Sequence, residues 1–469
     1  MKTVLVIDDD RGARLVVQWA FKKAGWRVLQ AEDGEVGLAM IAEHKPEVVV
    51  CDLMMPRCNG FQVCRAIRAR NDQVRQTKIV ISTASTYATD RQNAFEAGAD
   101  DYLTKPIDPE EMLRLVEGLT SGGPSGTTFQ LRSQQTPRSS FEHAASPTPS
   151  TNQPIRVKFW GVRGSLPTPG PATAYYGGNT ACVEVQADGE RIILDAGTGI
   201  RPLGQEWVAK YPDEPIAATV LITHTHWDHI QGFPFFIPAY NPRNRIRILG
   251  PTGARKGLEQ TLASQMESPY FPITMPEMPG NISIQELKDL EFAVGNVRVQ
   301  AQFMNHPGIC VGYRLFTSAG SIAFIPDNEL FVRQKSQTGI MTEKEAETQI
   351  DYARRQDQKL IEFLRDVDIL IIDAQYDEQE YLKHVGWGHS CVDDAVTIAN
   401  SAGVKQLFLF HHDPGHDDTK VAQMAAHGRQ LAVSSGSKLK VEAAREGIEV
   451  VLKPKPASRP AQVVADAVG

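Results

Sequence analysis

A segment with too few apolar side chains to form a packed core divides this chain into two parts. Residues 121–153 are rich in Ser, Gly, Pro, Thr and Gln. Such a composition buries too little apolar surface to offset the conformational entropy lost on folding, so we expect a flexible linker. The 469-residue chain is also too long for one ordinary hydrophobic core. We therefore expect one domain over residues 1–120, a second over 154–455 and a tail over 456–469.

The composition excludes several classes of protein. A formal net charge of −7 argues against a protein built mainly to coat nucleic acid. No apolar run is long enough to span a membrane, and the start, MKTVLVIDDD, turns acidic too early for a signal peptide. The six cysteines form no CxxC pair, which favours reduced thiols over a zinc ribbon. These features predict a cytoplasmic protein without membrane contact.

Short apolar runs alternate with amphipathic stretches in the first part. The runs read as strands over residues 3–7, 27–30, 47–51, 78–82 and 101–103, and helix-like stretches between them include 12–24 and 61–70. This alternation predicts an α/β fold, a parallel doubly wound (βα)5 sheet covered on both faces. In such sheets the active groups gather outside the carboxyl ends of the strands.

Chemically active side chains follow these predicted strand ends. Asp8 and Asp9 follow the first strand, Asp52 the third and Lys105 the fifth, while Thr83 closes the fourth. Clustered carboxylates resist ionising together unless a cation joins them, and Mg²⁺ suits such a site. Asp52 can then act as a nucleophile toward a phosphoryl group whose oxygens Thr83 and Lys105 bind. One acid alone would fit a solvated loop, but the whole set does not.

The segments VLVIDDD, VVVCDLMMPRCNGFQV, IVISTAS and ADDYLTKPID resemble the receiver domain of two-component response regulators. The resemblance implies phosphorylation of Asp52 by a sensor histidine kinase or a phosphotransfer protein. It also implies Mg²⁺ on Asp8, Asp9 and Asp52, and the switch residues Thr83, Tyr102 and Lys105. Because the linker is long, we expect coupling through docking or through dimerisation rather than through a rigid lever.

Histidines crowd the second part of the chain. Nine of the twelve fall between His224 and His416, which indicates a metal site. Strands are expected over residues 155–161, 181–186, 191–197, 297–303, 311–316, 321–325, 368–373 and 406–410, and helices over 343–365 and 391–401. The pattern is mixed α and β with two sets of strands, and it contains no helix-turn-helix segment, so specific DNA binding is not expected.

The sequence THTHWDHIQG carries the sharpest signal. In an extended segment, residues two apart point the same way, so His224 and His226 can grip one metal, and the following turn swings Asp228 and His229 toward a second. The remaining ligands must come from other predicted strand ends: His306, Asp327 and His411. We expect His306 to join the first two histidines, His411 to join Asp228 and His229, and Asp327 to bridge.

This set of residues resembles the metallo-β-lactamase fold, an αββα sandwich, over nearly all of residues 155–453. LDAGTG resembles the family's first motif, which implies that Asp195 orients the ligands. IPD, LIIDAQY and GWGHSCVDDA resemble motifs of the branch containing ribonuclease Z and small phosphodiesterases, which implies catalytic roles for Asp373 and His389. The chain lacks a Gly-rich basic insertion of the kind with which ribonuclease Z grips transfer RNA.

Several neighbouring residues are ambiguous in sequence. We expect His412 to point away from the metals, His416 to line the entrance and His384 to lie at the surface. For Trp227 and Trp387 we expect packing ahead of stacking on a substrate base.

These features predict a response regulator whose output is a dinuclear-metal phosphodiesterase. The expected cofactors are two divalent metals in the second domain, Zn²⁺ being favoured over Mn²⁺ or Fe. A small phosphodiester or RNA is the expected substrate, and a homodimer is compatible with the sequence. Two alternatives stay open: an ester, lactone or thioester hydrolase, and a module that binds a ligand without turnover.

Overall fold

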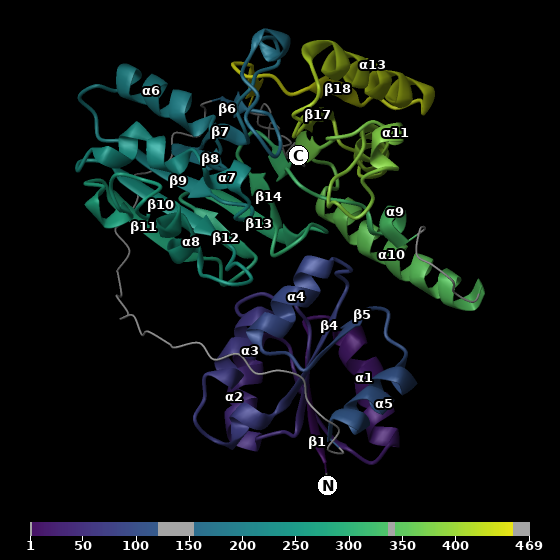
Figure 1. The fold of residues 1–469 in the computed structure, drawn as a ribbon. Coiled ribbons are helices and arrows are strands. Elements are labelled where there is room, and N and C mark those ends of the chain that lie inside the picture. Colours follow the sequence, from purple (N-terminus) through teal and green to yellow (C-terminus); the bar gives the residue numbers. More distant parts are fainter. Residues whose placement is uncertain (1, 121–153, 336–342, 454–469) are drawn as a thin grey trace, which may run out of the picture.

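The computed structural model describes residues 2–120, 154–335 and 343–453 (Figure 1). The expected linker over 121–153 and the expected tail over 456–469 lie outside the described residues. Within these ranges, no helix is both long and apolar enough to cross a lipid bilayer.

A five-stranded parallel sheet forms the centre of the N-terminal domain, in the order β2-β1-β3-β4-β5. The strands are β1 (Thr3–Ile7), β2 (Arg27–Ala31), β3 (Val48–Cys51), β4 (Lys78–Thr83) and β5 (Asp101–Thr104). The helices are α1 (Arg11–Lys23), α2 (Gly34–His44), α3 (Gly60–Arg68), α4 (Ala88–Ala97) and α5 (Pro109–Thr120), with a 3₁₀ turn η1 (Gln73–Gln76). Helices α1 and α5 cover one face and α2, α3 and α4 the other (Figure 1). The expected doubly wound α/β fold is confirmed, with strand ends displaced by at most one residue.

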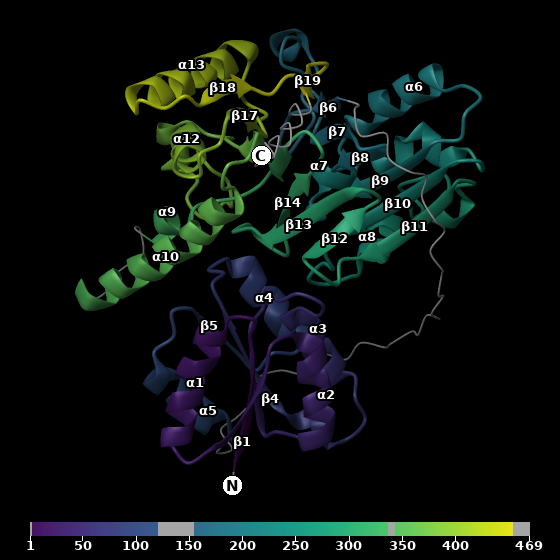
Figure 2. The same ribbon diagram turned by 180° about the vertical axis from the view of Figure 1, so that it is seen from behind.

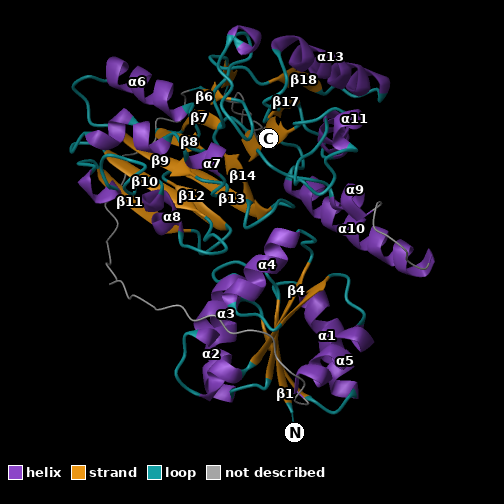
Figure 3. Ribbon diagram, in the orientation of Figure 1, coloured by secondary structure: helices purple, strands orange, loops and turns teal. Residues whose placement is uncertain are grey.

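Two seven-stranded mixed sheets face each other in the C-terminal domain (Figure 3). The first has the order β11-β10-β9-β8-β7-β6-β19 and the second the order β12-β13-β14-β15-β16-β17-β18. The strands of the first are β6 (Ile155–Gly161), β7 (Cys182–Ala187), β8 (Glu190–Leu194), β9 (Ala217–Leu221), β10 (Arg245–Gly250), β11 (Asn281–Glu286) and β19 (Glu449–Leu452). Those of the second are β12 (Glu291–Val294), β13 (Val297–Phe303), β14 (Val311–Phe316), β15 (Ser321–Ile325), β16 (Ile369–Asp373), β17 (Gln406–Phe410) and β18 (Lys440–Ala443).

Helices cover the outer face of each sheet, which completes the expected αββα sandwich. Their bounds are α6 (Ile200–Lys210), α7 (Trp227–Ile230), α8 (Leu258–Ser264), α9 (Phe331–Lys335), α10 (Glu343–Phe363), α11 (Glu378–Tyr381), α12 (Val392–Ser401) and α13 (Asp418–Ser434), with 3₁₀ turns η2 (Pro171–Thr173), η3 (Phe233–Phe235), η4 (Ile237–Tyr240) and η5 (Met275–Glu277). Side chains of both sheets form one central core, while α6 and α8 pack outside the first sheet and α10, α12 and α13 outside the second.

Strand direction determines where the polar loops lie. In the first sheet β8, β9, β10 and β11 are parallel, and in the second β15, β16, β17 and β18 are parallel. The carboxyl ends of parallel neighbours meet at one edge of a sheet, where loops can bring side chains from distant segments together.

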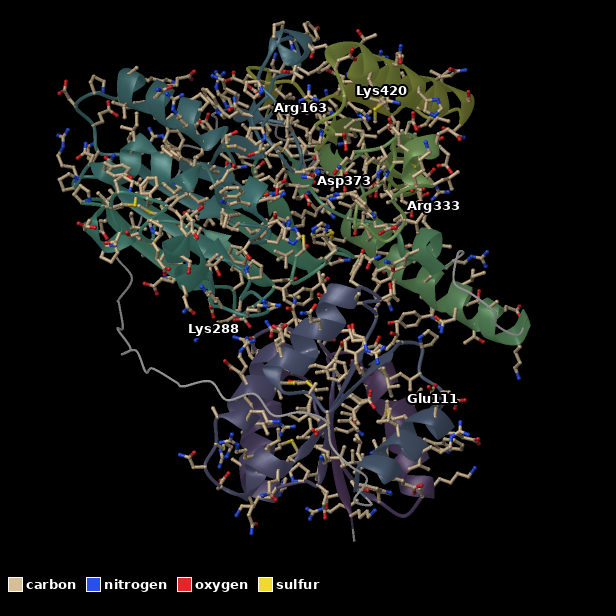
Figure 4. All side chains as sticks on the ribbon, in the orientation of Figure 1. Glu111, Arg163, Lys288, Arg333, Asp373 and Lys420 are labelled. Atoms are coloured by element: carbon tan, nitrogen blue, oxygen red, sulfur yellow. The ribbon has the colours of Figure 1, made fainter. Side chains whose placement is uncertain are left out.

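The two domains are docked. Helix α4 of the N-terminal domain lies against the C-terminal domain in both ribbon views (Figures 1 and 2). Lys288, whose carbonyl accepts a hydrogen bond of 2.7 Å from the Arg57 N–H, lies at the edge facing the N-terminal domain (Figure 4). Arg255 pairs with Glu96 at 2.9 Å, and Ile309 is buried among the N-terminal core residues. The sequence analysis expects coupling through docking or through dimerisation, and the structure shows a docked interface.

Truncating a side chain should lower the stability of the C-terminal domain most in the core between the two sheets. Phe408 is fully buried there, with its ring centroid 5.0 Å from that of Phe159. We expect Phe408→Ala to lower the free energy of unfolding by about 3–5 kcal/mol, because it removes buried apolar surface and leaves a cavity. Denaturant unfolding measures this loss. Val433→Ala, at a side chain that is 76% exposed on α13, should change it by less than about 0.5 kcal/mol, and equal losses would contradict the expectation.

Candidate functional site

Seven residues that the sequence suggests as metal ligands converge at one edge of the sandwich. His224 and His226 follow β9, Asp228 and His229 lie on α7, and the others follow strands β13, β15 and β17. Their ligand atoms form two groups, and within each group these atoms lie no more than 4.8 Å apart. The groups are His224, His226, His306 and Asp327, and Asp228, His229 and His411.

The Asp327 carboxylate lies between the two groups. Its Oδ2 is 3.6 Å from His224 Nε2 and 3.5 Å from His306 Nε2. Its Oδ1 is 3.2 Å from His229 Nε2 and 3.4 Å from His411 Nε2. Each oxygen therefore faces a different set of imidazoles, which is the geometry of a bridging ligand.

The donor atoms fit a pair of cations. His224 Nε2, His229 Nε2 and Asp327 Oδ1 are buried and have no hydrogen-bond partner among the residues that the structure describes. Buried polar atoms without partners are rare and costly, and a bound ion would satisfy all three. Imidazole and carboxylate donors without thiolate suit Zn²⁺, Mn²⁺ or Fe. His226 is the exposed member of the set, and its Nδ1 lies 2.9 Å from His306 Nε2.

In three of these histidines, the ring nitrogen Nδ1 pairs with another group of the protein. The pairs are His229 Nδ1 with Asp195 Oδ2 at 2.8 Å, His306 Nδ1 with the Gly388 carbonyl at 2.8 Å, and His411 Nδ1 with Gln375 Oε1 at 3.0 Å. With one ring nitrogen bonded, the other faces the centre of the site. The structure places Asp195 where the sequence analysis expects an orienting residue. Gln375 and Gly388 were missed, since neither residue type signals such a role.

The backbone around the site is unusual. Asp195 and His411 both have a φ of 60°, a left-handed conformation that non-glycine residues rarely adopt. A Cβ on Gly164 would lie 2.3 Å from His411 Nδ1, and one on Gly388 would lie 2.6 Å from His306 Nδ1. Such strain and such close approach concentrate at functional sites.

Burial and charge set the protonation of the group. Burial lowers the pKa of His224 and of His306 well below the usual value. Burial alone would raise the pKa of Asp327, but the neighbouring imidazoles of His411 and His229 hold it well below its usual range. Burial also lowers the pKa of His229, yet the carboxylates around it raise that pKa above the usual value. Neutral imidazoles and ionised carboxylates are the forms that bind metals, so His224, His306 and Asp327 are in a metal-binding form. His229, in contrast, would lose its proton when a metal binds.

His389 and Asp373 form a buried pair beside the centre. His389 Nδ1 lies 2.9 Å from Asp373 Oδ2 and 3.9 Å from Asp327 Oδ2. Burial lowers the pKa of His389, but Asp373 outweighs it and raises that pKa to about 9. The Asp373 carboxylate also accepts hydrogen bonds from the N–H groups of Asn328, Gln375 and Ser390. Asp373 is therefore enclosed by protein, whereas Nε2 of His389 has no hydrogen-bond partner in the part of the chain that the structure describes.

The carboxylates of the N-terminal domain also come together. Asp8, Asp9 and Asp52 each offer an oxygen, and all three oxygens lie within 4.8 Å of one another. Lys105 Nζ is 2.8 Å from Asp8 Oδ2 and 2.6 Å from Asp52 Oδ2. Burial and the nearby Asp52 raise the pKa of Asp8 to about 7 and that of Asp9 to about 6. A divalent cation such as Mg²⁺ would relieve this repulsion.

The expected switch residues lie next to this acidic cluster. Thr83 is buried, and its Oγ1 accepts a hydrogen bond from the Ser85 N–H at 3.3 Å. The buried Tyr102 hydroxyl donates to the Ser85 carbonyl at 3.0 Å. A cavity of about 600 Å³ lies between Asp52 and the C-terminal domain, lined also by Thr83, Lys105, Met304, Asn305 and Tyr352 of α10.

The residues left ambiguous by the sequence divide into two sets. His412 points away as expected, with Nε2 2.9 Å from the Ala444 carbonyl. His416 is buried, with Nε2 3.0 Å from Glu380 Oε1, and its place at the entrance stays a prediction. The packing expected for Trp227 and Trp387 is wrong: their side chains are 68% and 60% exposed.

Two family descriptions match this chain. Residues 4–117 match "Response regulator receiver domain", and residues 190–340 match "Beta-lactamase superfamily domain". Two curated relatives each match about a quarter of this chain. The DNA-binding dual master transcriptional regulator RpaA of a Synechocystis species is 40% identical over 119 residues, which cover 25% of this chain and 49% of that protein. The response regulator MprA of a Mycobacterium species is 40% identical over 116 residues, with the same shares covered. The chain thus spans about half the length of the curated relatives it matches.

Two solved structures cover mainly the C-terminal region. The metallo-beta-lactamase fold protein YhfI from Bacillus subtilis is 15% identical with a TM-score of 0.43, covering 64% of this chain and 99% of that one. A diphosphatase from the PhnP family is 18% identical with a TM-score of 0.42, covering 63% and 97%. Together with the folds described above, the family matches identify a response-regulator receiver domain at the N-terminus of this chain and a domain of the beta-lactamase superfamily at its C-terminus.

Proposed function

We propose that this chain is a two-component response regulator whose output is a dinuclear-metal phosphodiesterase controlled by phosphorylation of Asp52. The observation that carries the proposal is the Asp327 carboxylate, whose two oxygens face two separate sets of metal-ligating side chains. Two cations held side by side suit the displacement of an alcohol from a phosphodiester, since both the attacking and the leaving oxygen develop charge there.

Each candidate ligand has a place in this proposal. His224, His226 and His306 would hold one metal, Asp228, His229 and His411 would hold the other, and the Asp327 carboxylate would contribute to both. Asp195 orients His229. The ligand types favour Zn²⁺, and Mn²⁺ or Fe also suits them. In the receiver domain, Asp8, Asp9 and Asp52 would hold Mg²⁺, which prefers carboxylate oxygens.

The catalytic chemistry would be shared between metals and protein. When bound, the two cations supply positive charge that activates a water molecule and stabilises the phosphoryl oxygens. Asp373 holds Nδ1 of His389, which leaves Nε2 to donate a proton to the departing oxygen. Asp373 acts as a positioning residue, because its carboxylate is buried and already accepts several hydrogen bonds.

Exposed aromatic side chains favour a substrate with a base. Trp227 lies between the candidate ligands His226 and Asp228, and Trp387 lies two residues before His389. Both indole rings are exposed, so a base can stack on them with a gain of about 1–3 kcal/mol. A small nucleotide diester or RNA is therefore the proposed substrate class.

A phosphodonor partner belongs to the same proposal. A sensor histidine kinase or a phosphotransfer protein would phosphorylate Asp52, and Thr83 and Lys105 would bind the new phosphoryl oxygens. The Tyr102 hydroxyl donates to the Ser85 carbonyl, and the Ser85 N–H donates to Thr83 Oγ1, so Tyr102 would respond to a movement of Thr83.

Hydrolysis of bis(p-nitrophenyl) phosphate by Zn²⁺-loaded protein tests the reaction class. We expect turnover that falls at least about 100-fold in Asp228→Asn, because this change removes a charged ligand while keeping the size of the side chain. Asp213→Asn, at an exposed acid in the loop between α6 and β9, is the matched control and should keep full activity. Turnover of p-nitrophenyl acetate without turnover of the diester would favour an ester hydrolase instead. Two bound metals with neither activity would favour a ligand-binding module.

The leaving group reveals the role of His389. We expect His389→Ala to lower kcat by about 10²–10⁴-fold for a diester with an alkyl leaving group, which needs a proton. For a p-nitrophenyl leaving group the loss should be far smaller, because p-nitrophenolate departs unprotonated. Asp373→Asn should show the same pattern in weaker form. Equal losses with both leaving groups would show that His389 acts on the structure of the site and not on the proton.

Metal affinity tests the role of Asp195 separately from catalysis. We expect Asp195→Asn to weaken Zn²⁺ binding by about 10–100-fold, because the ring of His229 loses the acceptor that orients it. Competition with a chromogenic chelator measures the change. An unaltered affinity, with the fold intact by circular dichroism, would remove Asp195 from the site.

A further inference from the structure

One loop of the receiver domain reaches into the wall of the candidate metal centre. Tyr87, between β4 and α4, is buried at the domain interface. Its hydroxyl lies 3.0 Å from the Asn305 carbonyl, to which it donates, and 3.4 Å from Glu329 Oε2. Asn305 immediately precedes His306, one of the candidate ligands. The receiver domain thus touches the backbone that carries this ligand.

Glu329 connects the same contact to the other side of the centre. This fully buried carboxylate accepts hydrogen bonds from the Tyr381 hydroxyl at 2.8 Å, the Gly386 N–H at 2.8 Å and the Gly388 N–H at 3.0 Å. The carbonyl of Gly388 lies 2.8 Å from His306 Nδ1, and the next residue along the chain is His389. Glu329 therefore anchors the loop that orients His306 and carries His389.

Asp90, on α4, forms a second bridge between the domains. Its Oδ1 accepts a hydrogen bond from the Gly308 N–H at 2.8 Å, two residues after His306. Its Oδ2 accepts one from the Ser85 hydroxyl at 2.5 Å. The N–H of Ser85 donates in turn to Thr83 Oγ1, which lines the same cavity as Asp52. A series of hydrogen bonds therefore runs from Thr83, which faces Asp52 across the cavity, to the loop of His306.

These contacts differ from the ion pairs at the rim of the interface. Arg255 with Glu96 and Arg57 with Asp289 are exposed ion pairs at the rim, and such pairs contribute little. Tyr87, Asp90 and Glu329 are buried, so losing one partner leaves a desolvated polar group without a hydrogen bond. A movement of the β4–α4 loop must therefore be followed by the loops that it touches.

We propose that Tyr87 and Asp90 act as positioning residues for the metal centre, so that the phosphorylation state of Asp52 changes the geometry around His306 and His389 through the β4–α4 loop. The inference rests on the proposed function because it takes His306 as a metal ligand and His389 as a proton donor. The coupling itself is measured as a change in metal binding. A phosphoryl group on Asp52 recruits Thr83, Thr83 releases or shifts Ser85, and Asp90 and Tyr87 carry the shift to Asn305 and Gly308.

Metal affinity with and without a phosphoryl mimic measures this coupling directly. The probe is beryllofluoride with Mg²⁺ on the full chain, and the readouts are Zn²⁺ affinity and the absorption spectrum of the Co²⁺-loaded protein. We expect beryllofluoride to change the Zn²⁺ affinity of the wild-type protein at least about 5-fold, within the usual range of coupling between two sites. The response should disappear in Asp52→Asn, which cannot take the mimic.

Tyr87→Phe is the decisive variant, because it removes one hydroxyl and keeps the ring. We expect it to reduce the response to less than about 2-fold while the ¹⁹F signal of bound beryllofluoride stays unchanged. Asp90→Ala should act in the same direction. Two controls should keep the full response: Tyr270→Phe, at a side chain that is 84% exposed, and Arg255→Ala at the rim.

The outcomes separate this coupling from the proposed reaction. A full response in Tyr87→Phe, or none in the wild-type protein with the mimic bound, would overturn the coupling whatever the protein hydrolyses. A Zn²⁺ affinity that responds in the wild-type protein but not in Tyr87→Phe would support the coupling even if no phosphodiester were turned over.

Discussion

The buried carboxylate of Asp327 is the group on which the candidate centre depends. Asp327 lies two residues after β15, a strand with neighbours on both sides in the second sheet, and its side chain is buried. A buried carboxylate is costly unless opposite charge compensates it. His224 and His229, carried by the other sheet, face its two oxygens, and cations between them would supply the compensating charge. The two sheets therefore need each other to stabilise this one side chain.

Much of the fold could be predicted from the sequence because parallel sheets leave a strong local signal. Strands buried on both faces of a parallel sheet read as continuous apolar runs, and the predicted bounds over 3–7 and 47–51 agree with β1 and β3 to within one residue. The bounds predicted over 297–303 and 311–316 also agree with β13 and β14, which are antiparallel. The same rule suggested the candidate ligands, since polar residues at the ends of parallel strands share one edge. The ligands of the HxHxDH motif could be predicted from local backbone geometry alone. The structure places these side chains together, and their roles as ligands are what the proposed experiments test.

The residues around the ligands could not be predicted because their contacts are distant and their types common. Tyr87 and Glu329 are 242 residues apart in the chain, and a tyrosine or a glutamate alone indicates no buried hydrogen bond. Gln375 follows Asp373 by two residues, yet only the left-handed backbone of His411 brings that ring to it. The exposure of Trp227 was also missed, because a tryptophan beside ligands packs or stacks according to loops that sequence patterns do not describe.

In both domains the candidate functional residues lie in loops that follow strands, and this determines how the two sites are placed relative to each other. In the receiver domain the strand ends carry Asp8 and Asp52, and in the second domain loops of the sandwich carry His306. Docking sets these two functional edges face to face across one cavity, which Asp52, Thr83, Met304 and Asn305 all line. A change at Asp52 then does not have to be transmitted through the linker, because the β4–α4 loop alone separates it from the loop of His306. Buried contacts suit this task better than exposed ion pairs, since salt and solvent screen the latter.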